Sequence, residues 1–225
     1  MLAPFQTLVW SDAALYMFQW TGDTYVYRSS LVGRNCGLIS PNAAVTVDGV
    51  AYWMGRDSFW MYNGSVQRMP KVEDIRTFVY DQLDDQTLYQ AHVCYHPGFH
   101  QLEFFYTPSG QTSPTKSVTY DIATQCWWPD TLARTSSTNF TQGDTRPYLG
   151  LATGYIHQHE NTLNDNGSII DWSLTLAPYA LQEGLYNLAI DGFQFDFFDQ
   201  VGDITVTVTA YDRLNDTSTM DSGAY

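Results

Sequence analysis

Short apolar runs separated by tight turns are clearest between residues 37 and 69. The first run, AAVTV, ends at Asp48-Gly49, and VAYWM follows it directly. The next run, SFWMY, ends at Asn63-Gly64, and SVQRM closes the segment. Asp-Gly and Asn-Gly are strong signals for two-residue hairpin turns. The pattern therefore predicts a four-stranded antiparallel meander.

The hydrophobic period changes after this segment and predicts one helix near residues 71–84. Pro70 lies just ahead of the helix, and the acidic Glu73 and Asp74 would occupy its first turn, where they suit the helix dipole. Apolar residues recur there at helical spacing; they are Val72, Ile75, Phe78, Val79 and Leu83.

Most of the remaining chain reads as further strands. They are expected around HVCYH, QLEFFYT, KSVTYD and CWW, and then around YLGLAT, YIHQHE and IIDWSLTL. Near the C-terminus, DITVTVTAYD alternates apolar residues with threonine, which is typical of a half-buried strand. The predicted fold class is all-β with one inserted helix.

A weak internal repeat runs through these strands. LYMF, FWMY, EFFY and GYIH begin at residues 15, 59, 103 and 154. A period of this length, filled with short strands, is typical of β-propeller blades. About four blades would occupy residues 1–165, and residues 166–225 would form a C-terminal β-rich segment, which could be a further blade. The alternative is that an aromatic-rich all-β chain contains such four-residue motifs by chance.

The net charge and the cysteine content exclude several classes of function. The formal net charge of −14 argues against a sequence-reading nucleic-acid binder and against docking on an anionic membrane. Three cysteines without a CxxC motif predict free thiols, with neither a disulfide framework nor a zinc site. The first residues show no pattern of a signal peptide.

The histidines are the obvious candidates for metal ligands, but we expect no metal site. Pro97-Gly98 interrupts HVCYHPGFH, so its three histidines cannot share a helix face, and no carboxylate is evident beside them. On a strand His157 and His159 would share a face, but a third ligand is missing. Residues in turns, on the surface or in packing contacts are the expected interpretation, with no metal or cofactor; they are His92, His96, His100, His157 and His159.

No catalytic constellation stands out. YDIATQCWW is similar to the Asp-turn-Trp hairpins of sialidase propellers, but Asp121 and Trp127 are one residue too far apart and the accompanying Ser and Gly are missing. A glycosidase needs a pair of carboxylates across a cleft, and no pair is distinguished among the 24 acids. The sequence therefore predicts a non-enzymatic protein.

Several motifs of the chain form a recognisable series. The first reads Gly37-x-Ile-x-Pro-x-Ala43, then YWMG, then Phe59-x-x-Tyr-x-Gly64, ahead of the helix VEDIRTFVYDQLDDQ. Tyr120, Trp127, Arg134-Thr135 and GYIHQHE follow it. This series resembles the neck and tail proteins of double-stranded DNA bacteriophages, although Asn161 departs from their pattern. The best-known relatives of this kind are tail hubs, also named packaged-DNA stabilisation proteins, of short-tailed phages.

This resemblance implies a structural virion protein of the tail, assembled in the host cytoplasm. It implies a propeller in a homohexameric ring that continues the DNA channel below the portal and adaptor and anchors distal tail parts. DNA would pass through without sequence-specific binding, and no catalytic residue is implied. The alternatives are a secreted carbohydrate-binding or glycan-cleaving β-propeller and a receptor-type domain of a tail fibre.

Association with another polypeptide is the last expectation. An open propeller would leave sheet faces and strand edges unpaired, and such surfaces are association sites. We expect residues 1–20 to pack against a neighbouring subunit or another segment, with Trp10 and Tyr16 buried in that contact.

Overall fold

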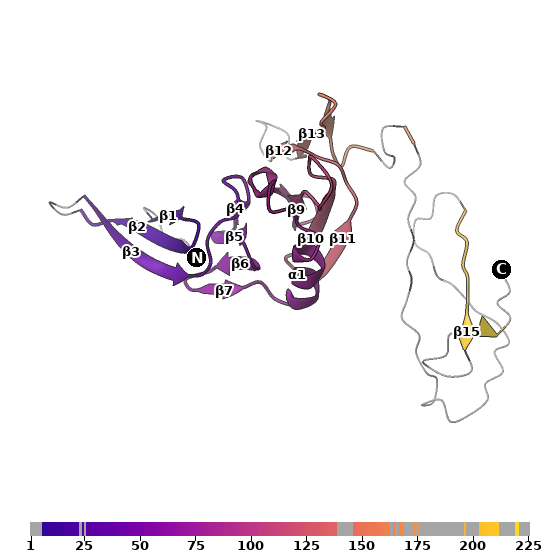
Figure 1. Cartoon of the computed structure of the whole chain (residues 1–225), viewed down its shortest axis with the longest axis horizontal. Helices are drawn as coiled ribbons and strands as arrows, with labels where there is room; N and C mark the ends of the chain where they lie inside the picture. Colours follow the sequence, from indigo (N-terminus) through magenta and orange to yellow (C-terminus); the bar gives the residue numbers. More distant parts are fainter. Residues whose placement is uncertain are drawn as a thin grey trace. The chain divides into compact units, whose positions relative to one another are not determined.

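The computed structural model describes residues 6–22, 24, 26–138, 146–162, 164, 167–168, 173, 175, 196, 203–211 and 219–220. The chain divides into two compact units, Met1–Ile169 and Ile170–Tyr225. Figure 1 shows the first unit as a succession of antiparallel sheets with one α-helix.

The first sheet contains three long strands in the order β1-β2-β3. They are β1 (Gln6–Trp10), β2 (Ala14–Trp20) and β3 (Tyr27–Arg34). A β-bulge lies in the pairing of β2 with β3, at Leu15 and Tyr16. Beyond the bulge the strands pair in a regular antiparallel register, which fixes the face on which each side chain lies.

The second sheet confirms the predicted meander. Its order is β4-β5-β6-β7, with β4 (Ala44–Val47), β5 (Val50–Met54), β6 (Phe59–Tyr62) and β7 (Val66–Arg68). Asp48 and Gly49 join β4 to β5 with φ angles of 50° and 76°. Two positive φ angles are the requirement of the hairpin turn that Asp-Gly favours.

The helix α1 (Glu73–Tyr80) confirms the predicted helix but is shorter than residues 71–84. Lys71 has a φ of 53°, in the left-handed region, so the helix cannot begin there. Val72, Ile75 and Val79 are buried, whereas Phe78 is exposed. The helical period therefore marks the buried side of α1. No helix among the described residues is long and apolar enough to cross a membrane.

The third sheet is also a four-stranded meander, and it packs against the second sheet. It contains β8 (His92–His96), β9 (Gln101–Tyr106), β10 (Lys116–Asp121) and β11 (Trp127–Asp130), after the short 3-10 helix η1 (Leu88–Gln90). The rings of Phe59 and Phe104 meet edge to face at 5.0 Å across the two sheets. Tyr52 and Tyr120 meet at 6.4 Å. These aromatic contacts join the two sheets and α1 in one hydrophobic core.

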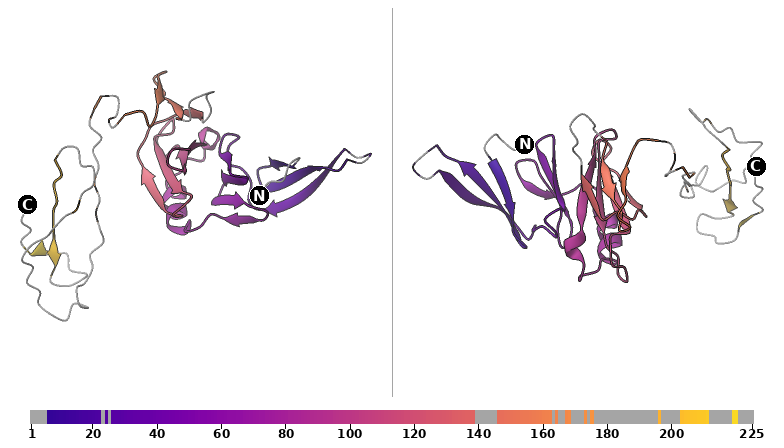
Figure 2. Two further views of the ribbon diagram at one scale, coloured as in Figure 1. Left: turned by 180° about the vertical axis from the view of Figure 1, so that it is seen from behind. Right: turned by 90° about the horizontal axis from the view of Figure 1, so that it is seen from above.

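The fourth sheet is small and lies beside the third (Figure 2). Its strands are β12 (Ser136–Thr138), β13 (Tyr148–Gly150) and β14 (Ile156–Gln158). Leu149 of β13 is fully buried against Cys94 and Phe105 of the third sheet. The predicted strands near YLGLAT and YIHQHE are thus confirmed, as are the four of the third sheet.

In the second unit, β15 (Ala210–Tyr211) pairs with β16 (Thr219–Met220). Along the predicted strand, Ile204, Val206 and Val208 are partly buried and the intervening threonines are exposed, as the alternation predicts. Among its described residues, Ala210 and Tyr211 form β15, and Thr207 takes part in a β-bridge. The strand expected at IIDWSLTL lies largely outside the described residues.

The all-β prediction with one α-helix is therefore confirmed. The described residues form no closed ring of sheets, so the propeller interpretation stays a prediction.

Candidate functional site

One face of the first sheet exposes six large apolar side chains. The register places Val9, Tyr16 and Leu31 side by side across the three strands. Phe18 lies in the next row, and Trp20 pairs with Tyr27. Their exposed fractions lie between 37% and 60%. We call this surface the open face; it consists of Val9, Tyr16, Phe18, Trp20, Tyr27 and Leu31.

The opposite face of the same sheet packs against the second sheet. Leu15 is fully buried there, and Trp10 meets Trp53 edge to face at a ring distance of 5.6 Å. Trp53 Nε1 donates a hydrogen bond to the Cys36 carbonyl. This contact belongs to the core of the chain itself.

The two residues predicted to form one assembly contact therefore lie on opposite faces. Trp10 pairs with Leu15 in the register, whereas Tyr16 pairs with Val9. A partner that covers the open face would touch Tyr16 and would not reach Trp10. A contact on the open face would therefore include Tyr16 and its neighbours, and a role of Trp10 in assembly stays a prediction.

A second feature is a buried charged cluster between the third and fourth sheets. His96 Nε2 lies 2.9 Å from Glu103 Oε2, and His96 Nδ1 lies 2.6 Å from Glu160 Oε1. Burial alone would lower the pKa of His96, but hydrogen bonding to the Cys94 thiol and the Glu103 carboxylate raises the pKa to about 11. The imidazole is therefore charged at neutral pH and donates a hydrogen bond from each nitrogen.

Further polar contacts complete this cluster. Ser117 Oγ donates to Glu103 Oε1 at 2.7 Å, and Arg134 Nε donates to His159 Nε2 at 2.9 Å. Burial and the positive charge of Arg134 lower the pKa of His159 to about 4, so its ring is neutral and can accept that bond. The cluster joins three strands of the third sheet to the segments that flank the fourth.

The local backbone is shaped to bring Glu160 into the cluster. Glu160 adopts a φ of 59°, which is uncommon for a residue other than glycine. A Cβ atom at Gly98 would lie only 2.9 Å from Glu160 Oε2, so glycine leaves room for the carboxylate.

The expectation that no carboxylate accompanies His96 was wrong. Of the expected turn, surface and packing positions, His96 takes a buried one. His92 is also buried and stacks on Phe105 at 4.7 Å, as a packing residue. A detectable signal was Glu103, a single carboxylate inside the apolar strand QLEFFY, which requires a partner if the strand is buried. His100 contacts the Tyr95 hydroxyl at 2.8 Å and lies 3.6 Å from Asp48.

Within the described part of the chain, no group of three or more His, Cys, Asp or Glu side chains is arranged to hold a metal ion. In the charged cluster both His96 nitrogens face carboxylate oxygens, which leaves neither for a metal.

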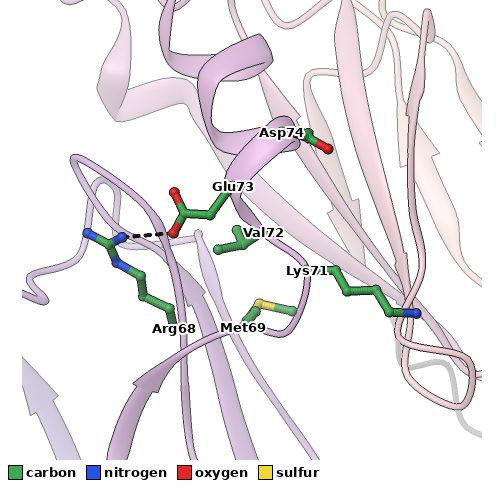
Figure 3. Close-up of a pocket in the computed structure, with 6 residues that line it drawn as sticks. All are labelled: Arg68, Met69, Lys71, Val72, Glu73 and Asp74. Atoms are coloured by element: carbon green, nitrogen blue, oxygen red, sulfur yellow. Dashed lines mark hydrogen bonds and ion pairs between the residues drawn. The ribbon is translucent and has the colours of Figure 1, made fainter.

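Among the described residues of the first unit, two of the surface cavities bear on the function. The larger, of about 550 Å³, lies among the first strands of the second, third and fourth sheets, with Ala44, Val93 and Ser137 in its wall. The smaller, of about 260 Å³, lies where α1 begins (Figure 3). There Glu73 accepts hydrogen bonds from Arg68 and Arg76, which lower the pKa of its carboxyl. The smaller cavity is lined by Arg68, Met69, Lys71, Val72, Glu73 and Asp74.

The phage-like phrases occupy packing and cluster positions. A Cβ atom at Gly37 would overlap the Asp12 carbonyl at 2.1 Å, so this glycine allows two backbone segments to meet. Tyr120 and Trp127 pack together at 4.7 Å. Arg134 and Glu160, from two separate phrases, both belong to the charged cluster.

A comparison of the chain with protein-family models and with curated proteins finds no match.

Proposed function

We propose that this chain is a structural, non-enzymatic protein of a double-stranded DNA phage tail. It would form the hub or nozzle ring that continues the DNA channel below the portal and adaptor and anchors distal tail parts. The open face carries this proposal, because contiguous exposed apolar surface of this kind marks a protein–protein contact. The type of assembly, a phage tail, is proposed from the resemblance of the sequence motifs to phage neck and tail proteins.

The arrangement of the sheets supports a propeller as the framework. The first strand of each of three successive sheets contacts the next, β4 with β8 and β8 with β12. Val93 N donates to the Asn42 carbonyl at 3.0 Å, and Ser137 Oγ donates to the Val93 carbonyl at 3.3 Å. Propeller blades surround a central channel. We propose that the larger cavity is one sector of that channel.

The charge of the chain suits a passage for DNA. A formal net charge of −14 repels phosphates, so DNA would slide through the ring without being gripped. Subunits of like charge must then associate through uncharged surfaces, and the open face is such a surface.

One observation favours the rival function, a carbohydrate-binding or glycan-cleaving propeller. The larger cavity is lined by uncharged polar groups, including Ser113, Thr135 and Ser136, with the exposed ring of Tyr89 at its edge. Hydroxyl groups and an aromatic ring are suited to a sugar. The cavity therefore makes glycan binding a measurable alternative.

Electron microscopy and a glycan array separate the two functions. For the proposed hub, micrographs of the purified chain contain rings with a central opening, and the array shows no specific binding. Specific glycan binding by a monomer, or turnover of a glycoside, would favour the rival. A trimer without a central opening would instead favour the tail-fibre domain.

A further inference from the structure

The open face carries no acidic side chain although the chain is strongly acidic. The residues that share this face across the first sheet are Thr7, Val9, Tyr16, Phe18, Trp20, Tyr27, Ser29 and Leu31, with Ala14 and Arg34 beyond the bulge. Arg34 is the one charged residue among them and its charge is positive, whereas the formal net charge of the chain is −14. A second copy can therefore approach this face without like-charge repulsion at the contact.

The fourth sheet, which is the last of the first unit along the chain, carries a smaller apolar surface. Leu149 and its cross-strand neighbours face the third sheet, so the opposite side, with Tyr148 and Ile156, faces away from it. Ile156 is 74% exposed, and its chain neighbour Tyr155 is 69% exposed. We call this surface the far face; it consists of Tyr148, Gly150 and Ile156, with Tyr155 beside them.

We propose that the open face of one copy packs on the far face of the next copy, in a head-to-tail contact. This inference rests on the proposed function, because a ring requires a contact between two different surfaces of the same chain. Pairing of the open face with itself would close a dimer and leave Ile156 and Tyr155 exposed. The head-to-tail contact covers both surfaces.

The size of the open face is sufficient for such a contact. Aromatic side chains bury roughly 150–250 Å² each. With somewhat less than half of that exposed, Tyr16, Phe18, Trp20 and Tyr27 offer on the order of 400 Å² per copy, to which Val9 and Leu31 add. Contiguous apolar patches above a few hundred Å² mark protein–protein contacts.

The chain already stacks its sheets in the same way. The inner face of the first sheet meets the second through Trp10 and Trp53, and the second meets the third through Phe59 and Phe104. In both contacts, large aromatic side chains from two sheet faces meet edge to face. The proposed contact continues this stacking from one copy to the next.

Complementation between two variants of the full chain tests the contact. Phe18→Asp places a charge on the open face, and Ile156→Asp places one on the far face. Each variant alone should be monomeric by sedimentation velocity, with self-association weakened at least about thirtyfold. An equimolar mixture should form a dimer, because one variant keeps its far face and the other its open face. Phe99→Asp, at an exposed turn position, should assemble as the wild type does.

Several results would overturn the contact. One is a monomeric wild type, and another is assembly of Phe18→Asp like the wild type. Loss of assembly in Phe18→Asp alone, with Ile156→Asp unaffected, would indicate self-pairing of the open face. Unchanged circular dichroism verifies folding, and Phe18→Ser replaces the aspartate variant if that one misfolds. Rings that ignore both substitutions would refute only the contact, whereas complementation without rings would refute only the hub.

Discussion

Replacement of His96 by glutamine should destabilise the fold in a pH-dependent manner. His96, Glu103 and Glu160 keep only 11%, 7% and 15% of their side chains exposed, so solvent screens their charges weakly. His96→Gln leaves two buried carboxylates without their positive partner. Removing one member of a buried ion pair typically costs about 3–5 kcal/mol. We expect a loss of that size at pH 6.5, where the stabilisation is still largely present.

The pH dependence follows from the pKa of His96 in the folded and unfolded chains. The unfolded histidine loses its proton near pH 6.5, whereas the folded one keeps it up to a pKa of about 11. Its stabilisation is therefore complete below pH 6.5 and is lost as the pH rises towards 11. Between pH 6.5 and about 8.5 the wild type should lose about 2 kcal/mol that the variant does not lose.

Urea unfolding followed by tryptophan fluorescence at these two pH values measures both effects. Ser117→Ala is a milder companion, because it removes only the hydroxyl donor to Glu103 and should cost about 1–3 kcal/mol. Equal pH dependence in the wild type and His96→Gln would refute the assignment of a charged histidine. So would a cost below about 1 kcal/mol for His96→Gln, a value typical of exposed ion pairs.

Phe104→Ala should cost about 3–5 kcal/mol of unfolding free energy, while the exposed Phe99→Ala should stay within about 0.5 kcal/mol; similar costs would contradict the core assignment. Trp10→Ala should lower the unfolding free energy by roughly 2–4 kcal/mol. Tyr16→Ala should weaken self-association and leave the unfolding free energy unchanged. The reverse result would contradict the placement of Trp10 on the inner face and Tyr16 on the open face of the first sheet. A chelator should leave the melting temperature unchanged, and a clear decrease would reveal a stabilising metal.

Local features of the fold could be predicted because neighbouring residues determine them. Asp48-Gly49 supplied both positive φ angles of its hairpin, and the alternation of apolar residues located the strands. The helix was predicted too long at its start because periodicity does not reveal the left-handed conformation of Lys71. It was predicted too long at its end because periodicity does not reveal that Leu83 pairs with Pro108 in a β-bridge.

The charged cluster could not be predicted in full because its members are distant in sequence. Glu160 lies 64 residues after His96, and Arg134 meets His159 across 25 residues. Only Glu103, within its apolar strand, indicated that a buried partner was needed. Likewise, Trp10 and Tyr16 could be placed on opposite faces only once the register of β1 with β2 was known.

A cryo-electron microscopy reconstruction of the purified, assembled chain tests the central claim most directly. The proposal predicts a closed, rotationally symmetric ring with a continuous axial channel and with the open face of every copy covered by the next copy. A reconstruction in which Tyr16 and Phe18 remain in solvent, or a homogeneous population of single chains, would contradict it.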